Sequence, residues 1–374
     1  MFKLANKMRI IFFLANFSLG GAAESIVKLS EFLSKYGFSV LLISINKNQY
    51  KKRLLNAGCE IKEIKVSRVL YSFIELRKII KLETNKKFVK IIFFSSIHYA
   101  NILSIFARMG NKKLKLILTE RSSFAELKIS HSLFRNIKNF IVYTLSKFFY
   151  KYSDHIITNS NYEKIYIKKN FKIKNISCIH PPSIKKVFKI RKKIKRNKIT
   201  NIIFVGRISK EKGLDLIVKA LSILKNTANF DFNLKIYGNG IEKDKIVYMA
   251  KKYKINKKIF FLGFEKNHDK IFKNADLFIN SSYFEGLPNA LVQALNYNVF
   301  SICSDAPGGN LEVIKYGKLG LTFEKGNYFD LASKINLYLK NTYKIHSLKY
   351  KTNHLKKYTE MISYNKYIEV IKSI

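Results

Sequence analysis

The feature that most constrains the fold is an alternation of apolar strand-like runs with helical patterns along the chain. In the first half, residues 23–36, 49–57 and 70–82 have helical spacing of apolar side chains and lie between runs that fit buried strands. Strands that alternate with helices form a parallel sheet covered by helices. The expected strands cover residues 8–15, 38–45, 60–66, 89–95, 114–119, 155–159 and 176–180, and then 202–205, 230–237, 259–263, 277–281, 300–304 and 320–323. The sequence therefore predicts an α/β protein built on parallel sheets.

The length and one basic stretch suggest how the chain divides. A chain of 374 residues has room for about two domains, each large enough to bury its own core. Two prolines end the last strand of the first half, and the charged run KKVFKIRKKIKRNK that follows them fits a solvated linker. We expect the first domain over residues 1–182, a linker over 183–199, the second domain over 200–345 and a helical segment over 346–374.

The charge of the chain is extreme and has two explanations. Lys and Arg number 70 against 25 Asp and Glu, which gives a formal net charge of +45 and a pI near 10.0. Attraction to an anionic partner, either a membrane surface or nucleic acid, is one explanation. A codon bias toward Lys, Asn and Ile is the other, and it fits both the absence of Trp and the spread of lysines over the whole chain. Net attraction to acidic lipid head groups remains an expectation.

Cysteine usage and missing motifs narrow the chemistry. Cys59, Cys178 and Cys303 lie far apart and form no C-x-x-C pair, so the sequence suggests neither a zinc site nor a disulfide framework, and a reducing cytoplasm fits. The apolar run at residues 8–17 is too short for a membrane span and lacks the cleavage site of a signal peptide. The sequence contains no Asp-x-Asp pair and no G-x-x-x-x-G-K-[ST] loop. We therefore expect no cofactor and no required metal.

The stretch SSYFEGLPNALVQAL puts a carboxylate, a turn and an expected helix start next to one another. Glu285 precedes Gly286, Leu287 and Pro288. Pro288 is expected at the first helical position, where a proline loses no needed donor, and apolar residues then recur at helical spacing. The free N–H groups and positive dipole end of such a helix suit phosphate and sugar hydroxyl groups, with Glu285 beside them as an acceptor. Gln293 lies two turns along, on roughly the same face. An ordinary capped helix packed on a sheet is the alternative for this turn taken alone.

A second motif, FVGRISKEKGLDLIVKAL, precedes the first in the same half of the chain. An apolar strand runs into Gly206 and Arg207, and Lys212 and Gly213 then open an amphipathic helix. Two cations at a strand-to-helix junction suit a diphosphate. In these two motifs the sequence resembles the family 4 glycosyltransferases, whose signatures include G-R-x-x-x-x-K-G and a Glu, seven residues, Glu pattern. That family consists of retaining nucleotide-sugar enzymes with the GT-B fold, two Rossmann-like domains that face each other across a cleft.

The resemblance implies roles for the two motifs in donor binding. Arg207, Lys212 and the N–H groups near Gly286 would stabilise the leaving nucleoside diphosphate, and Glu285 would orient hydroxyl groups of the donor sugar. Gln293 stands where the family has its second Glu, which would accept hydrogen bonds from the ribose. Because an amide oxygen also accepts a hydrogen bond, we expect an active enzyme.

At three strand ends of the first half, residues match positions to which the resemblance gives a role in the substrate site. Gly20 and Gly21 look like the G-G-A-E turn of the family, although a tight structural turn explains them equally well. His98 follows a central strand, where the family carries a His that contacts the donor sugar; a lone His is more often a helix cap or a surface residue. Glu120 and Arg121 resemble the S-E-R segment, with a plain ion pair as the alternative.

Further matches in the second half add to the expected donor site. Gly238, in YGNG, lies at a strand end, although this fragment of a dinucleotide fingerprint says little by itself. Phe264 begins the loop where the resemblance places the nucleotide base. The segment SDAPGGNLEVI looks like the S-D-x-P-x-G-x-x-E loop of the family. By resemblance, the helical segment at the end of the chain would cross back to the first domain.

One expected helix is a candidate for membrane contact. In residues 133–152, aromatic residues alternate with lysines: Phe134, Ile137, Ile141, Leu145 and Phe148 form one apolar stripe, and Phe140, Tyr143, Phe149 and Tyr150 widen it. The arc is wider than one buried face requires, so part of it could meet lipid. A thick core helix is the alternative, and stacking on single-stranded nucleic acid would suit the same pattern.

These expectations combine into one predicted function. The chain would be a cytoplasmic retaining glycosyltransferase, peripheral on the inner face of the membrane, that uses a UDP- or GDP-linked sugar to extend a bacterial surface glycan on a lipid-linked acceptor. The alternatives are a GT-B epimerase or phosphorylase, a relative that has lost catalysis, and a basic nucleic-acid-binding protein indicated by charge alone. We expect no nucleic-acid partner because no RNA-binding signature supports that reading.

Overall fold

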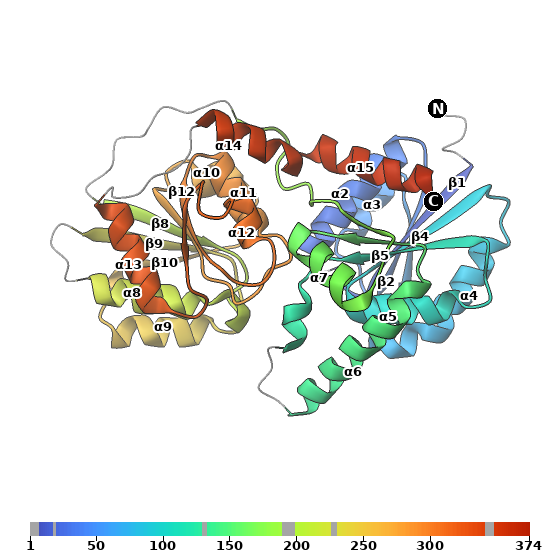
Figure 1. Ribbon diagram of the computed structural model, residues 1–374, viewed down its shortest axis with the longest axis horizontal. Helices are drawn as coiled ribbons and strands as arrows, with labels where there is room; N and C mark the ends of the chain where they lie inside the picture. Colours follow the sequence, from blue (N-terminus) through green and yellow to red (C-terminus); the bar gives the residue numbers. More distant parts are fainter. Residues whose placement is uncertain (1–6, 18–19, 129–132, 189–198, 226–229, 341–347) are drawn as a thin grey trace. The chain divides into compact units, whose positions relative to one another are not determined.

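The structure is a computed structural model that describes residues 7–17, 20–128, 133–188, 199–225, 230–340 and 348–374. The chain forms two compact units: unit 1 contains Met1–Pro182 with Ser363–Ile374, and unit 2 contains Ser183–Ile362. Most of the stretch expected to be a linker, residues 189–198, lies outside the described residues. Each unit is described by itself below, with the element labels of Figure 1.

Unit 1 is a sheet of seven strands in the order β3-β2-β1-β4-β5-β6-β7, and every neighbouring pair is parallel. The strands are β1 (Met8–Leu14), β2 (Ser39–Ile45), β3 (Glu60–Ile64), β4 (Lys90–Ser96), β5 (Leu114–Glu120), β6 (His155–Thr158) and β7 (Ile176–Cys178). The helices are α2 (Gly21–Lys35), α3 (Lys51–Asn56), α4 (Phe73–Thr84), α5 (His98–Arg108), α6 (Leu133–Phe149) and α7 (Asn161–Phe171), with short 3-10 turns η1 (Val69–Ser72), η2 (Phe124–Lys128) and η3 (Tyr150–Tyr152).

Unit 2 has a second parallel sheet, of six strands in the order β10-β9-β8-β11-β12-β13. The strands are β8 (Ile199–Val205), β9 (Asp231–Tyr237), β10 (Ile259–Gly263), β11 (Leu277–Asn280), β12 (Phe300–Ser304) and β13 (Leu321–Phe323). The helices are α8 (Leu214–Leu224), α9 (Lys243–Lys252), α10 (His268–Phe272), α11 (Asn289–Asn296), α12 (Asn310–Val313), α13 (Tyr328–Leu339) and α14 (Leu348–Leu355), with 3-10 turns η4 (Lys210–Lys212), η5 (Asn256–Lys258) and η6 (Lys356–Tyr358). The prediction of two parallel-sheet α/β domains is confirmed.

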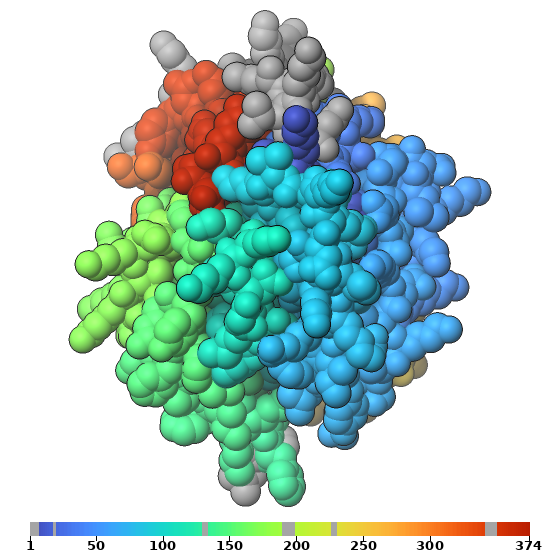
Figure 2. All heavy atoms as spheres, turned by 90° about the vertical axis from the view of Figure 1, so that its right-hand side faces the viewer, coloured from blue at the N-terminus to red at the C-terminus, as the bar shows by residue number. Residues whose placement is uncertain are grey.

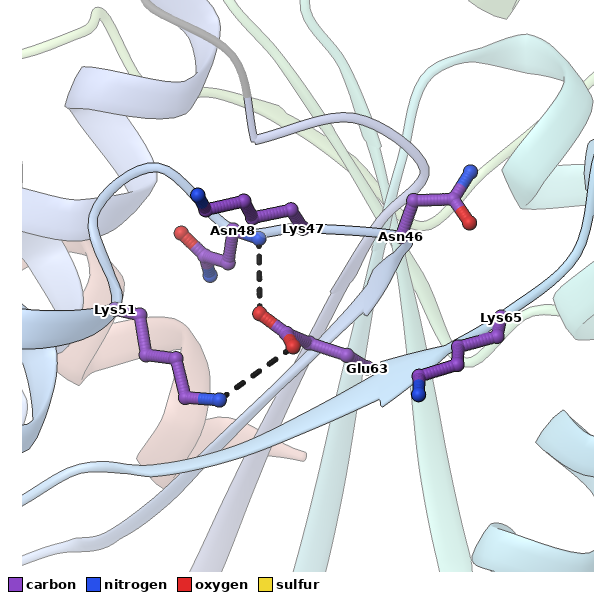
Figure 3. A pocket seen from close by; sticks show the side chains of 6 residues that line it. All are labelled: Asn46, Lys47, Asn48, Lys51, Glu63 and Lys65. Carbon is purple, nitrogen blue, oxygen red and sulfur yellow. Dashed lines mark hydrogen bonds and ion pairs between the residues drawn. The ribbon is translucent and has the colours of Figure 1, made fainter.

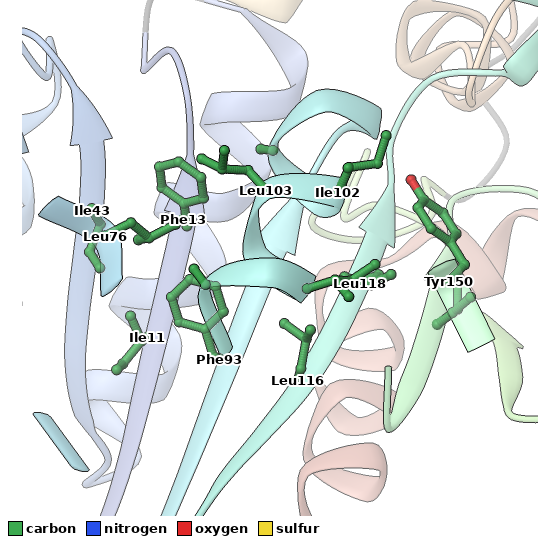
Figure 4. Close-up of a cluster of buried hydrophobic side chains, with 14 of the residues drawn as sticks. Ile11, Phe13, Ile43, Leu76, Phe93, Ile102, Leu103, Leu116, Leu118 and Tyr150 are labelled. Atoms are coloured by element: carbon green, nitrogen blue, oxygen red, sulfur yellow. The ribbon is translucent and has the colours of Figure 1, made fainter. Parts of the chain in front are cut away.

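The core of unit 1 lies on both faces of its sheet because side chains alternate along each strand. On β1, Ile11 and Phe13 join the cluster under α4 and α5, which Figure 4 shows, whereas Ile10 and Phe12 join the opposite cluster. The last helix, α15 (Glu360–Ser373), completes that opposite cluster with four buried side chains, Tyr364, Tyr367, Ile368 and Ile371. Since burial of each such side chain contributes roughly 2 kcal/mol, the end of the chain is integral to unit 1.

Helix α5 is one of the helices that the sequence patterns did not predict, together with α9, α10 and α12. Most of its residues from His98 through Ala107 are buried, and its apolar residues have a helical spacing that could have located it. Its N-cap, Ile97, has a positive φ of 78°. Left-handed backbone at a β-branched residue is costly, and neither propensity nor periodicity signals it.

Helix α6 packs with the opposite face from the one its main apolar stripe suggested. Val142 and Ser146 are buried where α6 packs against α5, α7 and the turn η2, while Phe134, Phe140 and Phe148 are exposed. Figures 1 and 2 show the N-terminal end of α6 projecting from unit 1. The wide apolar arc therefore covers more than the core requires.

Candidate active site

The candidate site of unit 2 forms where loops meet at the carboxyl edge of the sheet, which is the edge where open parallel sheets bind ligands. The loop after β8 approaches the loop after β11 so closely that a Cβ on Gly213 would lie 2.2 Å from the carbonyl oxygen of Ser281. A Cβ on Gly308 would lie 1.8 Å from the carbonyl oxygen of Glu285. Both glycines also have positive φ, 61° and 121°. Only glycine fits at these two contacts, so the loops are held at fixed positions.

Lys212 and Glu285, which the sequence placed 73 positions apart, are in direct contact. The Lys212 ammonium donates to Oε1 of Glu285 at 2.6 Å, and the two side chains are only 20% and 12% exposed. The backbone reinforces the contact, because Tyr283 N–H donates to the carbonyl of Glu211 at 2.8 Å. The site therefore holds a cation and a carboxylate side by side at the sheet edge, as diphosphate and sugar hydroxyl recognition both need.

Arg207 lies in the loop after β8, shortly before Lys212, and its side chain is much more exposed than those of Lys212 and Glu285. Its side chain is 74% exposed, and its guanidinium is 3.2 Å from Oε1 of Glu211. Burial would raise the pKa of Glu211, but hydrogen bonding from Ser209 and the nearby Arg207 charge outweigh it, and the pKa is lowered. Glu211 therefore stays ionised and holds Arg207 at the rim of the site.

The expected helix start after Glu285 is present, with one difference of position. Helix α11 begins at Asn289, and Pro288 is its N-cap, not its first helical residue as predicted. The carbonyl of Pro288 accepts from the N–H groups of Leu291 and Val292. Gly286 accepts from Gly309 N–H, which ties the turn to the loop after β12. Leu287 is buried in the core of unit 2, so its side chain anchors the turn.

Gln293 lies on α11 with a specific partner for its amide. Its Nε2 donates to the carbonyl oxygen of Ser183 at 3.1 Å. An ionised Glu at this position would place a carboxylate against that carbonyl, so the amide suits this chain better than the acid of the family pattern. The role of Gln293 toward the donor stays a prediction.

The other two predicted positions of unit 2 differ in character. Gly238 allows close backbone approach, because a Cβ there would lie 1.9 Å from the carbonyl oxygen of Gly206. Phe264 follows β10 and is 57% exposed. An aromatic ring at the sheet edge offers a surface on which a base can stack.

In unit 1, His98 and Glu120 come together inside the protein. His98 is the first residue of α5 and Glu120 the last of β5, and each is 1% exposed. Nδ1 of His98 lies 2.8 Å from Oε2 of Glu120. Burial lowers the pKa of His98, but the charge and hydrogen bond of Glu120, together with the charges of Glu126 and Glu163, outweigh it, and the pKa is raised. The other Glu120 oxygen accepts from Asn101, at 2.8 Å, and from the Tyr150 hydroxyl.

The other predicted site residues of unit 1, all of which the structure describes, form no hydrogen bond or ion pair with the side chains of His98 and Glu120. Arg121 does not pair with Glu120: its guanidinium donates to Ser25 Oγ at 2.9 Å and lies 3.4 Å from the Tyr367 hydroxyl. Gly20 and Gly21, by contrast, are exposed at the start of α2. The substrate roles predicted for these residues and for His98 remain predictions.

Glu163 is a buried acid that sequence reasoning missed. It lies in the first turn of α7, is 1% exposed, and accepts from the N–H of Phe124 at 2.9 Å. Burial raises its pKa to about 7, with Glu120 and His98 among the charges that act on it. The S-x-x-E spacing from Ser160 is a capping-box signal that could have located it, because Ser160 Oγ accepts from Glu163 N–H.

A shallow hollow of about 380 Å³ lies at the carboxyl ends of β2 and β3 (Figure 3). Three lysines line it around Glu63, whose Oε1 accepts from Asn48 N–H at 2.9 Å. That hydrogen bond, which acts against burial, lowers the pKa of Glu63.

Across the residues that the structure describes, no cluster of His, Cys, Asp and Glu could hold a metal ion.

Models of two protein families match adjoining parts of the chain. The model described as Glycosyltransferase Family 4 matches residues 19–182, and the model described as Glycosyl transferases group 1 matches residues 186–358. The two matches meet at the boundary between unit 1 and unit 2.

Relatives and solved structures are similar over most of the chain. The N-acetylgalactosamine-N,N'-diacetylbacillosaminyl-diphospho-undecaprenol 4-alpha-N-acetylgalactosaminyltransferase of Campylobacter jejuni is 26% identical over 237 residues, which cover 63% of each protein and thus less than two thirds of that relative. The GalNAc-alpha-(1->4)-GalNAc-alpha-(1->3)-diNAcBac-PP-undecaprenol alpha-1,4-N-acetyl-D-galactosaminyltransferase of the same bacterium is 24% identical over 340 residues, 89% of each. Anabaena HepE in complex with UDP has the same fold, with a TM-score of 0.76 at 15% identity over 98% of this chain and 100% of that one.

Proposed function

Because the chain belongs to the family 4 glycosyltransferases, which have the GT-B fold, we propose that it moves a sugar from a nucleotide-sugar donor to a growing bacterial surface glycan. The observation that carries the proposal is the contact of Lys212 with Glu285 at the sheet edge of unit 2. A donor needs both a cation for its diphosphate and an acceptor for its sugar hydroxyl groups, and this pair offers the two within 2.6 Å.

The chemistry follows from the charge that develops as the glycosidic bond breaks. The leaving nucleoside diphosphate becomes more negative, so Lys212 and Arg207 stabilise the transition state more than the bound donor. Glu285 orients hydroxyl groups of the sugar. In the retaining reaction, the acceptor attacks from the face that the diphosphate leaves, and a leaving-group oxygen takes the acceptor proton.

The acceptor class rests on the relatives. Both Campylobacter jejuni proteins are named for acceptors in which a glycan is attached to undecaprenol through a diphosphate. We propose a lipid-linked acceptor of that general kind for this chain. The high positive charge suits such a substrate, since both the diphosphate and the surrounding lipid surface are anionic.

Ligand-induced thermal stabilisation tests the donor assignment. UDP and GDP are each titrated at physiological salt, and the cognate nucleotide at 100 times its Kd should stabilise the protein by about 2.7 kcal/mol. Hydrolysis of several UDP- and GDP-linked sugars then identifies the donor. A protein that responds to neither nucleotide but binds single-stranded nucleic acid, with steep salt dependence, would instead be the nucleic-acid-binding alternative.

The exposed face of α6 supports the proposal of peripheral attachment to the inner face of the cytoplasmic membrane. Phe134 and Phe140 are 85% and 70% exposed, and the basic side chains of Arg135 and Lys138 are interleaved with them. An aromatic face flanked by cations is the pattern of a helix that lies in the lipid interface. No helix within the described ranges has both the length and the apolarity to cross a bilayer.

Vesicle flotation tests the attachment. The protein should float with vesicles that contain phosphatidylglycerol at low salt, less with phosphatidylcholine alone, and less at high salt. Phe134→Ser with Phe140→Ser should abolish flotation. Ile74→Ser, which changes an apolar side chain of α4 that is 65% exposed, is the matched control. Recovery of the wild-type protein in the unbound fraction at low salt would refute the attachment.

A further inference from the structure

Ser282 contacts Glu285 through its side chain, and both of its backbone polar groups are hydrogen-bonded to other side chains. Its hydroxyl donates to Oε1 of Glu285 at 2.7 Å. Its N–H donates to Oδ1 of Asn280 at 3.2 Å, and its carbonyl accepts from the Ser304 hydroxyl at 2.6 Å. Ser282 itself is 1% exposed. The two backbone hydrogen bonds fix the position of the Ser282 backbone, so its hydroxyl stays within reach of Glu285.

Asn310 connects the two residues that hold the Ser282 backbone. Its Nδ2 donates to the carbonyl and to the hydroxyl oxygen of Ser304, at 3.0 and 3.1 Å. Its Oδ1 accepts from Nδ2 of Asn280 at 3.4 Å. Asn310 and Ser304 are fully buried. In such an environment each hydrogen bond is strengthened and an unpaired group is costly. The hydrogen bonds therefore favour one arrangement of four side chains, called here the Ser282 network: Asn280, Ser282, Ser304 and Asn310.

Oε1 of Glu285 accepts from two donors, and bound substrate would compete for one of them. Lys212 donates at 2.6 Å and Ser282 at 2.7 Å. A diphosphate beside Lys212 would attract the ammonium away from the carboxylate, because a diphosphate carries more negative charge. The Ser282 hydroxyl has a small dipole and no net charge, so the diphosphate attracts it much less and it keeps its hydrogen bond to Glu285.

We infer that Ser282 is a positioning residue that keeps the Glu285 carboxylate in place when Lys212 turns to the diphosphate, and that Asn310 acts through Ser282. The inference rests on the proposed function. Neither residue needs to touch the donor. The carboxylate orientation matters because an acceptor misplaced by about 1 Å can lose most of its effect on a reacting group.

The test compares variants by kcat, by donor KM and by melting temperature in donor hydrolysis and transfer. Ser282→Ala should lower kcat about tenfold or more, which is the usual effect of losing a hydrogen bond to a charged group, while donor KM stays within about twofold. Ser282→Thr keeps the hydroxyl and should recover most of the lost kcat. Ser222→Ala is the matched control, since the Ser222 hydroxyl donates only to a carbonyl within α8.

A double-mutant cycle tests the part played by Asn310. Asn310→Ala should lower kcat as Ser282→Ala does, with a lower melting temperature because Ser304 and Asn280 lose their partner. Ser282→Ala added to Asn310→Ala should then cost less than twofold more, because the second change removes a contact already lost. Full multiplicative losses would show that Asn310 does not act through Ser282.

The outcomes separate the inference from the proposed function. If wild-type protein turns over no donor at all, the proposed function fails. If the wild type is active and Ser282→Ala keeps its kcat within twofold, the inference is wrong. It is equally wrong if Ser282→Thr is as inactive as Ser282→Ala while both melt at the wild-type temperature.

Discussion

The two units place charge differently at the same edge of the same kind of sheet. In unit 1, His98, Glu120 and Glu163 are each 1% exposed and are sealed beneath aromatic side chains such as Phe124. In unit 2, the Lys212–Glu285 pair remains partly accessible and Arg207 is mostly exposed. The same sheet edge therefore carries buried charge in unit 1 and accessible charge in unit 2.

The contrast follows from the loops that end each strand. In unit 2, glycines at 213 and 308 let the backbones of neighbouring loops meet directly, and the charged side chains beside them remain partly accessible. In unit 1, helix α5 begins at His98 itself and buries the imidazole against Phe124. The charge of unit 1 should therefore govern stability and its pH dependence, and the charge of unit 2 should govern turnover.

The largest expected effect is loss of stability in Glu120→Ala. The substitution removes the partner of His98, Asn101 and Tyr150 in a buried site. Breaking a buried pair on one side costs about 3–5 kcal/mol. Urea unfolding measures the loss. Glu75→Ala removes an exposed ion pair with Lys78 and should cost less than about 1 kcal/mol, so equal effects of the two would remove the contrast.

The next effect is a pH-dependent gain of stability in Glu163→Gln. The folded-state pKa is raised from 4.5 to about 7, so unfolded chains lose this proton at lower pH than folded ones. Wild-type stability from this group is fully present below about pH 4.5 and is lost as the pH rises through about 7, by about 3 kcal/mol. Gln keeps an acceptor for Phe124 N–H, so the variant should be more stable than wild type at pH 8 and should gain nothing at pH 4.

Urea unfolding of wild type and variant across pH 4–8 makes that comparison. Glu324→Gln, an exposed acid of unit 2, serves as the control and should show no such divergence. A difference between Glu163→Gln and wild type that does not change with pH would show that Glu163 ionises normally in the fold.

Lys212→Ala and Arg207→Ala should each lower donor kcat/KM roughly thirtyfold or more. This corresponds to a loss of at least about 2 kcal/mol of transition-state stabilisation, because a charged contact to the diphosphate is removed. Melting temperatures should change little for Arg207→Ala, whose ion pair is exposed. Lys210→Ala, a neighbouring exposed lysine, is the control. Wild-type turnover in both variants, with folding intact, would refute the donor site of unit 2.

The smallest effect concerns Gln293→Glu. The acid matches the family pattern but sets a negative charge against the Ser183 carbonyl that now accepts from Nε2. These effects oppose each other, so donor affinity should change by no more than about tenfold, about 1.4 kcal/mol, while Glu285→Gln should reduce turnover far more. Donor titration and initial rates measure both. Activity that arises only in Gln293→Glu would indicate a relative that has lost catalysis.

Much of the fold was predictable because it depends on local patterns. Every expected strand is present to within a few residues, since buried parallel strands are continuous apolar runs that end at Gly, Pro or polar residues. Helix α5 was missed although its apolar residues have helical spacing, and only the positive φ of its N-cap, Ile97, has no sequence signal. The exposed face of α6 was not predictable, because two apolar arcs compete for one core and only packing selects between them.

The candidate site divides in the same way. Lys212 and Glu285 were predicted separately from their motifs, yet nothing in the spacing required them to touch. His98 and Glu120 were each predicted at a strand end, but their burial with Tyr150 could not be read from the chain. The capping-box spacing could have located Glu163, whereas the Ser282 network depends on contacts of Ser282 with Ser304 and of Asn280 with Asn310 that no local pattern signals.

By itself, the sequence determined the α/β class, the strand order along the chain and the residue types available at each strand end. It could do so because periodicity, turn residues and charge are local properties. The tertiary structure alone decided which of those charges are sealed and which remain accessible. That decision depends on close backbone approach at Gly213 and Gly308, and on side chains packing from distant elements, neither of which a linear pattern encodes.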